Sequence, residues 1–223
     1  MKILVISGGK HPYEESTPVL EGFLRGADHD VMVYWDAGVL RDAKKMEEYD
    51  VLVFNTLRAR DTALTEEEQT GMKNFIKSGK GFVCIHISGC IPESWPEYRA
   101  ITGGGWVAGT SFHPPYGQFT VTIQNSDHPD VAGISNFVTN DELYMGIEYS
   151  LGNNVFMTAD FGGGTYQWGG QPIYMPDGTF PLGWTRTYGE GKVFVTLLGH
   201  NGQSFETSEF QQVVLNGIQW ATS

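Results

Sequence analysis

The sequence predicts an α/β fold with a doubly wound, mostly parallel sheet and an inserted region of loops and strands. Two observations support this fold class. The short apolar runs within the first 90 residues are continuous rather than alternating, which is typical of strands that are buried on both faces. Segments with helical periodicity separate these runs in a β-α-β-β-α-β order, and this order favours a doubly wound sheet.

The N-terminal part contains the first three expected strands and one helix. Strands are expected at residues 2–6, 31–35 and 51–54, each of which is a short apolar run. Between the first two, Thr17 is expected to be the N-cap of a helix and Pro18 its first residue, because proline is well tolerated there. The apolar face of this helix would comprise Val19, Leu20, Phe23, Leu24 and Ala27.

A second helix is expected to begin after Thr65. Glu68 stands three residues further on, which completes a capping-box pattern. Ser78-Gly79 is expected to end this helix, since glycine readily adopts the left-handed conformation of a helix C-terminus. A fourth strand is expected at residues 82–87. The apolar side of the helix would comprise Met72, Phe75 and Ile76.

The composition changes between about residues 91 and 188, where glycine, proline and aromatic residues become dense. Strands are expected at residues 119–123 and 155–159. We interpret the region as an insertion of loops and strands over one edge of the sheet. Because no linker-like composition brackets it, residues 1–223 are expected to form a single domain.

Regular structure returns near the C-terminus. A strand is expected at residues 192–198, followed by a helix that begins near Ser208. Gln211 completes a capping-box pattern with Ser208. The buried stripe of this helix would comprise Phe210, Val213, Val214, Ile218 and Ala221.

The composition argues against several functional classes. The formal net charge is −12, and an acidic surface repels phosphate backbones, so nucleic acid is not expected as a partner. The chain has 2 cysteines, too few for a disulfide framework, which fits a reducing compartment. The N-terminal apolar run is too short for a signal-peptide core, and no later stretch is long enough to span a membrane. We therefore expect a cytoplasmic protein.

Three of the 6 histidines follow expected strands at the same edge of the sheet. His11 lies in the loop after the first strand, His86 at the end of the fourth, and His200 after the strand at residues 192–198. In an open α/β sheet, ligands bind beyond the C-terminal ends of the strands. We therefore expect these side chains to lie close together and to carry the function.

Clustered histidines suit two kinds of chemistry. Neutral imidazoles with a carboxylate form a ligand set for Zn²⁺ or another divalent ion. Without a metal, the same histidines serve as general acid and base. The carboxylate would come from Asp141 or Glu142. The structural alternative is that each histidine caps a strand end or bonds a backbone carbonyl, and for His11 both alternatives remain open.

Other reactive residues are better explained by structure. Cys84 lies inside an apolar strand, so we interpret it as a buried structural thiol. Ser88 does not fit a Gly-x-Ser-x-Gly nucleophile turn. His128 stands in a Ser-Asp-His-Pro-Asp segment typical of a turn. The loop at residues 7–10 lacks both the Lys-Ser/Thr ending of a phosphate-binding loop and the spacing of a dinucleotide fingerprint. His113, which precedes two prolines, is a candidate to reach the site from the insertion.

A series of short motifs resembles the ThuA-like (trehalose utilisation) family, in the same order and over nearly the whole chain. The motifs are Gly79-Lys80-Gly81-Phe82-Val83-Cys84-Ile85-His86-Ile87-Ser88, Trp95, Tyr98, Gly103-Gly104, Phe112-His113-Pro114, Asp127-His128-Pro129, Asp141-Glu142-Leu143-Tyr144, Pro181-Leu182-Gly183-Trp184, Gly189-Glu190-Gly191-Lys192-Val193-Phe194 and Leu198-Gly199-His200. The resemblance implies a flavodoxin-like, class I glutamine amidotransferase-like fold.

The chain lacks the cysteine nucleophile of glutamine amidotransferases. In that fold a cysteine nucleophile occupies the turn after the strand, and here the resemblance puts His86 there and His200 at the place of the catalytic histidine. Without the thiol, glutamine hydrolysis through a thioester is not expected. The family instead implies a role in carbohydrate use. Aromatic side chains suit a sugar site, and the candidates for substrate contact, in addition to His113, are Trp106, Trp168, Trp184 and Tyr144.

The leading hypothesis is an enzyme that acts on a sugar or an oxidised disaccharide, with His86, His200 and Glu142 as catalytic residues. His11, His86 and His200 would hold a metal such as zinc, for a hydrolase, lyase or isomerase reaction. The alternative is a non-catalytic carbohydrate-binding or regulatory domain on a degenerate amidotransferase fold. A flavodoxin-like electron carrier ranks last, because the loop after the first strand lacks a hydroxyl-rich phosphate cradle. No nucleotide or flavin is expected, and a homo-oligomer is compatible with the fold class.

Overall fold

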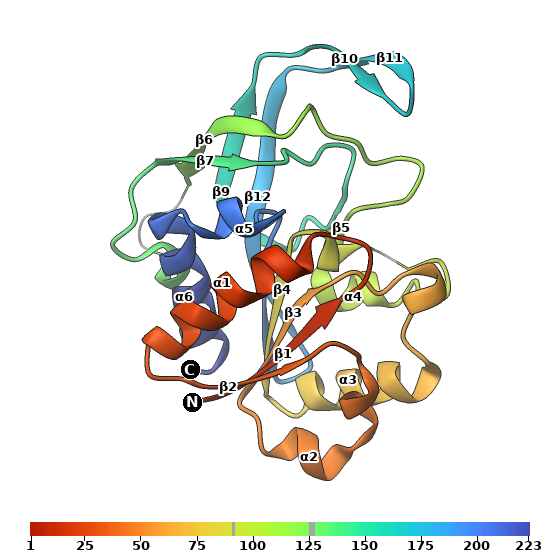
Figure 1. Cartoon of the computed structure of the whole chain (residues 1–223), viewed down its shortest axis with the longest axis vertical. Helices are drawn as coiled ribbons and strands as arrows, with labels where there is room; N and C mark the ends of the chain where they lie inside the picture. Colours follow the sequence, from red (N-terminus) through yellow and green to blue (C-terminus); the bar gives the residue numbers. More distant parts are fainter. Residues whose placement is uncertain (91, 125–127) are drawn as a thin grey trace.

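The structure, a computed structural model, describes residues 1–90, 92–124 and 128–223, and a large twisted sheet dominates it (Figure 1). Across these residues the sheet has nine strands in the order β2-β1-β3-β4-β13-β12-β9-β6-β7. The first five strands in this order are parallel to their neighbours. They are β2 (Asp30–Tyr34), β1 (Lys2–Gly8), β3 (Val51–Thr56), β4 (Gly81–Ile85) and β13 (Gly191–Thr196).

The parallel strands are buried on both faces. In β1, Ile3 and Val5 contribute to one hydrophobic cluster, whereas Leu4 and Ile6 contribute to a second cluster on the opposite face. All four side chains have 0% exposure. Burial on both faces explains why these strands are continuously apolar in the sequence. The predicted fold class is confirmed.

The second half of the chain lengthens the sheet rather than covering it. Its strands are β6 (Gly117–Ile123), β7 (Phe137–Asp141), β9 (Asn154–Phe161) and β12 (Gly178–Tyr188). β12 pairs antiparallel with β13, and β9, β6 and β7 continue outward from it. The expected position over one edge of the sheet is therefore corrected, because these strands continue the hydrogen-bond ladder. Residue 91, where the insertion was expected to begin, lies outside the described part of the chain.

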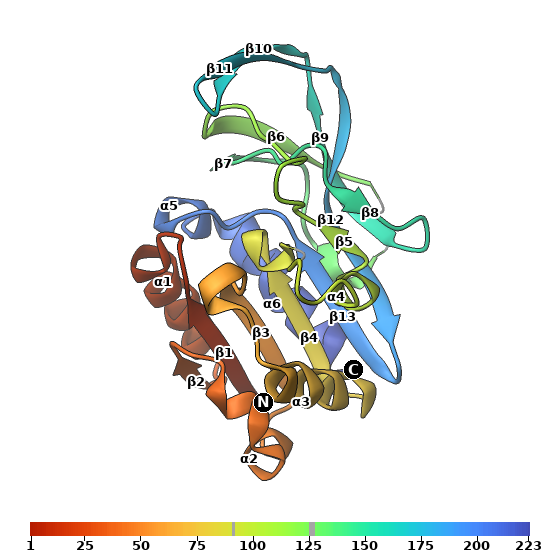
Figure 2. The same cartoon turned by 90° about the vertical axis from the view of Figure 1, so that its right-hand side faces the viewer.

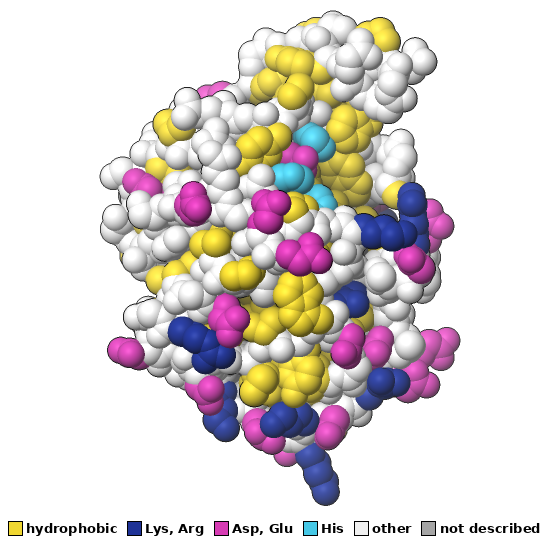
Figure 3. Space-filling view, in the orientation of Figure 1, with side chains coloured by type: hydrophobic (Ala, Val, Ile, Leu, Met, Phe, Trp, Pro, Cys, Tyr) yellow, Lys and Arg dark blue, Asp and Glu magenta, His cyan; other side chains and the backbone are white. Residues whose placement is uncertain are grey.

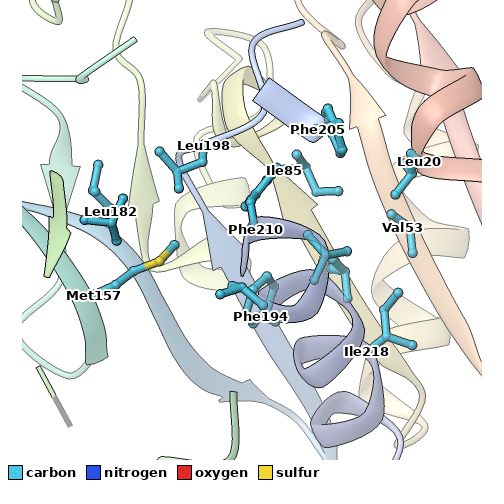
Figure 4. Close-up of a cluster of buried hydrophobic side chains, with 14 of the residues drawn as sticks. Leu20, Val53, Ile85, Met157, Leu182, Phe194, Leu198, Phe205, Phe210 and Ile218 are labelled. Atoms are coloured by element: carbon cyan, nitrogen blue, oxygen red, sulfur yellow. The ribbon is translucent and has the colours of Figure 1, made fainter. Parts of the chain in front are cut away.

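Helices cover both faces of the parallel strands (Figure 2). They are α1 (Tyr13–Gly26), α2 (Ala43–Glu47), α3 (Glu66–Lys77), α4 (Tyr98–Thr102), α5 (Gly202–Phe205) and α6 (Ser208–Ala221). α1 and α6 bury their apolar stripes in one cluster, and α3 buries its stripe in the other. Figure 4 shows how Phe210 of α6 packs with Phe194 of β13, close to Met157 and Leu182 of the antiparallel strands. One of the two hydrophobic clusters thus contains residues from both halves of the sheet.

Short elements complete the chain and support the loops at one end of the sheet. They are the 3₁₀ turns η1 (Gly38–Arg41), η2 (Arg60–Thr62), η3 (His86–Gly89) and η4 (Pro129–Val131), the pair β5 (Gly104–Gly105) and β8 (Glu148–Tyr149), and the hairpin β10 (Gly164–Trp168) and β11 (Gln171–Met175). Among the helices of the described residues, none combines the length and the apolar character that crossing a membrane requires.

The structure corrects the predicted start of one helix and confirms the starts of the other two. α1 begins at Tyr13, one turn before Thr17, and Pro18 lies inside it. Thr17 does not cap the helix because its hydroxyl bonds the Ser7 hydroxyl at 2.6 Å and the Asn55 amide at 3.2 Å. The capping box at the start of α3 is present as expected, with both reciprocal bonds.

At α6 the expected capping box is not formed. The hydroxyl of Ser208 bonds the Glu209 carboxylate at 2.8 Å, and the Gln211 side chain donates to the Phe205 carbonyl at 2.8 Å. Thr207 occupies the N-cap position and Ser208 is already the first residue of the helix, so the Ser208–Gln211 pattern is one residue out of register for a capping box. The predicted buried stripe of this helix is nevertheless confirmed, since all five of its apolar residues are buried.

Candidate functional site

Three loops at the C-terminal edge of the parallel strands bring three histidines together. His11 follows β1, His86 follows β4 directly, and His200 follows β13. Their ring centroids lie 4.7 to 5.4 Å apart. In Figure 3 histidine side chains gather beside an acidic side chain, with hydrophobic side chains on either side. The parallel topology therefore produces the arrangement that the strand ends suggested.

His86 occupies a sharp turn with a left-handed backbone, at φ 53°. Such a conformation costs free energy for a residue with a Cβ and is characteristic of functional sites. The Nδ1 atom of His86 lies 2.7 Å from the carbonyl oxygen of Leu197, to which it donates. Because a carbonyl oxygen can only accept, this bond places a proton on Nδ1, and Nε2 faces the cluster.

Glu142, which directly follows β7, sits at the centre of the histidines. Its Oε2 atom lies 3.4 Å from Nε2 of His86 and 3.2 Å from Nδ1 of His200. Its Oε1 atom lies 3.3 Å from Nε2 of His113. The structure therefore brings His113 to the cluster as well. A single nearly buried carboxylate balances several imidazoles that would otherwise repel one another when protonated.

The spacing of the side chains suits a tetrahedral metal ion. His11, His86, His200 and Glu142 each offer one ligand atom, and these atoms all lie within 4.8 Å of one another. Ligands bound at zinc distances in a tetrahedron are separated by roughly 3.3–3.6 Å. The distances already given, together with 2.9 Å between Nε2 of His11 and Nδ1 of His200, fall near that separation. The remaining separations lie within 4.8 Å, so the four side chains could converge on one ion.

The hydrogen bonds outside the cluster point to the same chemistry. His11 directs Nδ1 to the carbonyl oxygen of Lys10 at 3.3 Å, just as His86 directs Nδ1 to Leu197. Histidines that bind metals usually donate their second nitrogen in this way, which fixes the tautomer and the ring orientation. In both residues Nε2 is thereby the nitrogen that is free to face the cluster.

Burial and mutual charge set the protonation of the cluster. Burial, with further contributions from His86 and His200, lowers the pKa of His11 to about 3, so this ring is neutral at pH 7. Burial alone would raise the pKa of Glu142, but its hydrogen bonds with His200 and His86 hold it well below its usual range. Burial opposes the charged form of His200 as well, but Glu142 raises its pKa above the usual value. The cluster thus contains an ionised carboxylate and a neutral His11.

Asp141, the alternative carboxylate of the sequence prediction, has a different position. It is 1% exposed, and its oxygens accept backbone N–H bonds from Glu142 at 2.8 Å, Gly199 at 2.7 Å and His200 at 3.3 Å. The side chain ties the end of β7 to the loop that follows β13. Asp141 is therefore a positioning residue, and Glu142 supplies the carboxylate of the cluster.

Aromatic rings form a wall beside the cluster. The Tyr144 hydroxyl lies 2.5 Å from Nε2 of His86. The ring of Trp106 lies 4.6 Å from that of Tyr144, and the ring of Trp168 lies 4.7 Å from that of His113, between centroids. The hairpin β10–β11 carries Trp168 to this place. Trp106 and Trp168 are half-buried and are positioned to contact a ligand held at the cluster, whereas Tyr144 is only 1% exposed.

One predicted substrate contact is wrong. Trp184 has 0% exposure and its indole N–H donates to the Thr102 carbonyl at 2.7 Å, so it is a core residue of β12. Cys84 is fully buried as expected, and burial raises the pKa of its thiol to about 12. His128 is also buried, stacked on Phe156, and its Nδ1 accepts from a backbone N–H within its turn. Residue 127, part of the same motif, lies outside the described residues.

Sequence reasoning missed Tyr116, whose ring centroid lies 5.3 Å from that of His200. Its hydroxyl donates to the Asn140 carbonyl at 3.0 Å and contacts the Asn201 side chain at 3.2 Å. The signal available in the sequence was its place directly after the two prolines that follow His113, which stiffen the segment. The carbonyl of Leu197 was also missed, because a backbone atom leaves no sequence signal.

Comparisons with known proteins agree with this architecture. The family model described as ThuA, trehalose utilisation, matches residues 2–221. No curated protein matches the sequence. The fold is similar to that of a protein described as ThuA-like from Parabacteroides merdae, with a TM-score of 0.79 and 21% identity over 100% of this chain and 90% of that one.

Two further solved structures extend the comparison. A protein described as cytoplasmic from Salmonella typhimurium LT2 has a TM-score of 0.67 and 15% identity, and the match covers 100% of both chains. A protein from Thermoplasma acidophilum that is described as part of a GMP synthase has a TM-score of 0.58 and 12% identity, over 99% of this chain and 95% of that one. At these identities the likeness concerns the fold, which is shared with amidotransferase-like proteins.

Proposed function

The chain belongs to the ThuA (trehalose utilisation) family, and on that basis we propose that it is a metal-dependent enzyme acting on a sugar or an oxidised disaccharide. His11, His86 and His200 would hold the ion together with Glu142. The observation that carries the proposal is the spacing of their ligand atoms, all within 4.8 Å of one another. Imidazole and carboxylate ligands suit Zn²⁺ and related divalent ions.

A bound divalent ion would act as a Lewis acid on a substrate oxygen. The protein side chains around it have separate roles. The Tyr144 hydroxyl lies 2.5 Å from Nε2 of His86 and also interacts with Glu142, and the residue is only 1% exposed, so Tyr144 would hold these two side chains in position. The Nδ1 atom of His113 lies 2.7 Å from the Pro114 carbonyl and its Nε2 faces Glu142, so the imidazolium form satisfies both oxygens. His113 is therefore a candidate proton donor.

The aromatic wall supports a carbohydrate as the substrate class. Trp106 and Trp168 present ring faces beside the cluster, and such faces pack against the apolar faces of sugar rings while excluding water. The missing cysteine supports the absence of glutamine amidotransferase activity, because His86 occupies the turn after β4. We also propose a cytoplasmic location, which the low cysteine content and the similar Salmonella protein described as cytoplasmic support.

The test is an activity screen of the zinc-loaded protein against sugars and oxidised disaccharides, with products identified by mass spectrometry. Hydrolysis adds water to the products, a lyase splits the substrate without adding water, and an isomerase leaves the mass unchanged. The proposal expects turnover that disappears in His86→Asn, a change chosen because asparagine tolerates the left-handed backbone of residue 86. His29→Gln is the matched control, since His29 precedes β2 at the opposite edge of the sheet.

The same screen separates the enzyme from a non-catalytic carbohydrate-binding domain. Sugar binding that survives in His86→Asn, with no turnover by the wild type on any compound of the screen, would support the binding domain and contradict the enzyme. Turnover that is equal in the wild type and in His86→Asn would show that the cluster is not the active site.

A further inference from the structure

A cavity lies beside the histidine cluster, and we call it the Trp106 cavity after one of its lining residues. Its volume is about 470 Å³, within the range of small-molecule sites. The loops that follow β1, β3 and β4 form it, together with Trp106. Among the described residues that line it, none belongs to the cluster of His11, His86, His200 and Glu142. The cavity is therefore a separate space at the same edge of the sheet.

The Trp106 cavity is connected to the cluster through shared elements. Lys10 lines the cavity and directly precedes His11, and Ile87 lines it and directly follows His86. Trp106 lines the cavity while its ring lies 4.6 Å from the ring of Tyr144, between centroids. A molecule with one part at the cluster would therefore have its other part directed past Trp106 into the cavity.

The cavity is apolar along its walls, and hydrogen bonds hold one of its loops. Leu57, Ile87, Pro92 and Trp106 supply the apolar surface. The loop after β3 is held in place because the hydroxyl of Thr62 donates to two of its carbonyls, those of Leu57 at 2.9 Å and Ala59 at 3.0 Å. A rigid wall lowers the entropy cost of binding. The apolar walls suit a ligand with an apolar face.

The charges of the lining cancel. Lys10 and Arg60 are positive, and Asp61 and Glu93 are negative. Lys10 and Asp61 pair with each other at 3.3 Å and are both well exposed. Because neither sign is in excess, the cavity offers no net attraction for an anionic group such as a phosphate. The hydroxyl of Ser94 remains in the lining as a partner for a neutral polar ligand.

We propose that the Trp106 cavity binds the neutral, non-reacting ring of a glycoside, either a second sugar or an aryl group, while the reacting sugar lies at the cluster. This inference rests on the proposed function, since it assumes that the reacting sugar is bound there. It assigns to Trp106 the role of a shared wall between two subsites. Two-ring ligands would consequently bind more tightly than single sugars or sugar phosphates.

Cys90 provides a direct reporter of the cavity. It lines the cavity and is half-buried, whereas the other cysteine, Cys84, is fully buried. The rate at which an aromatic disulfide reagent modifies Cys90 therefore measures whether the cavity is filled. Cys90→Ser is the control that removes the signal and shows that Cys84 does not contribute.

The probes are trehalose, maltose, cellobiose and phenyl glucoside, compared with glucose and glucose 6-phosphate. At saturation, at least one two-ring probe is expected to slow modification by about fivefold or more, because the bound fraction of the protein is protected. Glucose and its phosphate are expected to leave the rate nearly unchanged. Failure of all four two-ring probes to protect Cys90, or equal protection by glucose 6-phosphate, overturns the inference.

A variant that fills the cavity separates this inference from the proposed function. Ala108 lines the cavity and is exposed, so Ala108→Trp is expected to remove protection by the two-ring probe while zinc binding stays at the wild-type level. Ala27→Trp on the exposed end of α1 is the matched control. Turnover of a two-ring substrate with an unchanged KM in Ala108→Trp would overturn the inference but keep the proposed function. If neither wild type nor any variant binds zinc or turns over substrate, but a two-ring probe still protects Cys90 in wild type, the proposed function is overturned and the inference about the cavity stands.

Discussion

The contact between Gly105 and the turn of His86 allows a quantitative test of how the site is held. Gly105 lies in β5 with φ +148°, and a Cβ built on it would be 1.9 Å from the carbonyl oxygen of Gly89. Gly89 is the last residue of η3, whose first residue is His86. Gly105→Ala must therefore displace this turn. The added Cβ has a fixed position on residue 105, and the atoms of Gly89 that it would meet are backbone atoms, which cannot rotate away.

The expected cost follows from two contributions. An alanine at positive φ costs roughly 1–2 kcal/mol. Displacement of a well-packed backbone adds roughly 1–3 kcal/mol. The expected loss in the free energy of unfolding of Gly105→Ala is therefore roughly 2–5 kcal/mol. The matched control is Gly109→Ala, at φ +79° with nothing within 4 Å of the added Cβ, so only the first contribution applies.

The assay is urea unfolding of the metal-free proteins, followed by zinc titration of the folded variants. Gly105→Ala is expected to be clearly less stable than Gly109→Ala and to bind zinc more weakly, because His86 moves with its turn. If the two variants lose the same free energy of unfolding and bind zinc equally, the close approach of β5 to η3 does not position His86 and the reasoning is refuted.

Three further predictions concern charge and capping. Glu142→Gln removes the carboxylate that raises the pKa of His200, so that pKa is expected to fall in an NMR titration of the metal-free protein; an unchanged titration contradicts the contact. Burial raises the pKa of Asp130 to about 7, so its stabilising contribution is present below about pH 4 and is lost as the pH rises through 7. Asp130→Asn is therefore expected to raise the free energy of unfolding at pH 8 by about 2 kcal/mol or more relative to wild type, and no gain in urea unfolding at that pH argues against a buried charge. Thr65→Ala removes the N-cap hydroxyl of α3 and is expected to cost about 1 kcal/mol in thermal or urea unfolding, whereas a loss of the same size in Ser208→Ala, where no capping bond forms, would contradict this assignment.

The parallel half of the fold could be predicted because its signals are local. β1 is a run of apolar residues long enough to bury both faces, and Thr65 with Glu68 encodes a helix start within four residues. The start of α1 could not be predicted in this way. Thr17 resembles an N-cap in sequence, but its hydroxyl bonds Ser7 and Asn55, and the latter is 38 residues away. A tertiary hydrogen bond of this kind overrides a local preference.

The candidate site was predictable to the extent that strand ends determine it. His11, His86 and His200 follow parallel strands, and the topology alone brings them to one edge. The carboxylate could not be chosen from sequence, because Asp141 and Glu142 are adjacent and point in different directions from the end of β7. The prediction that Trp184 contacts substrate was wrong because the sequence does not show that this residue is buried.

Aromatic residues serve a core and a ligand site equally well, and only burial distinguishes the two uses. Trp184 lies on the fully buried part of β12, whereas Trp106 and Trp168 lie in loops or hairpins beside the cluster. The sequence shows a tryptophan among glycines and other aromatic residues in each of these places. The distinction requires the pairing of β12 with β13, which the dense glycine and aromatic pattern of this segment does not reveal.

The central claim is that His11, His86, His200 and Glu142 form a metal site. The most direct measurement is zinc binding by equilibrium dialysis to protein purified without a metal-affinity tag and first stripped with chelator. Wild type is compared with His86→Asn, Glu142→Gln and the control His29→Gln. The account predicts one zinc ion per chain for wild type and His29→Gln, and affinity weakened at least about tenfold in the other two. Stoichiometric binding that is equally tight in all four proteins, or no binding by folded wild type at neutral pH, would contradict it.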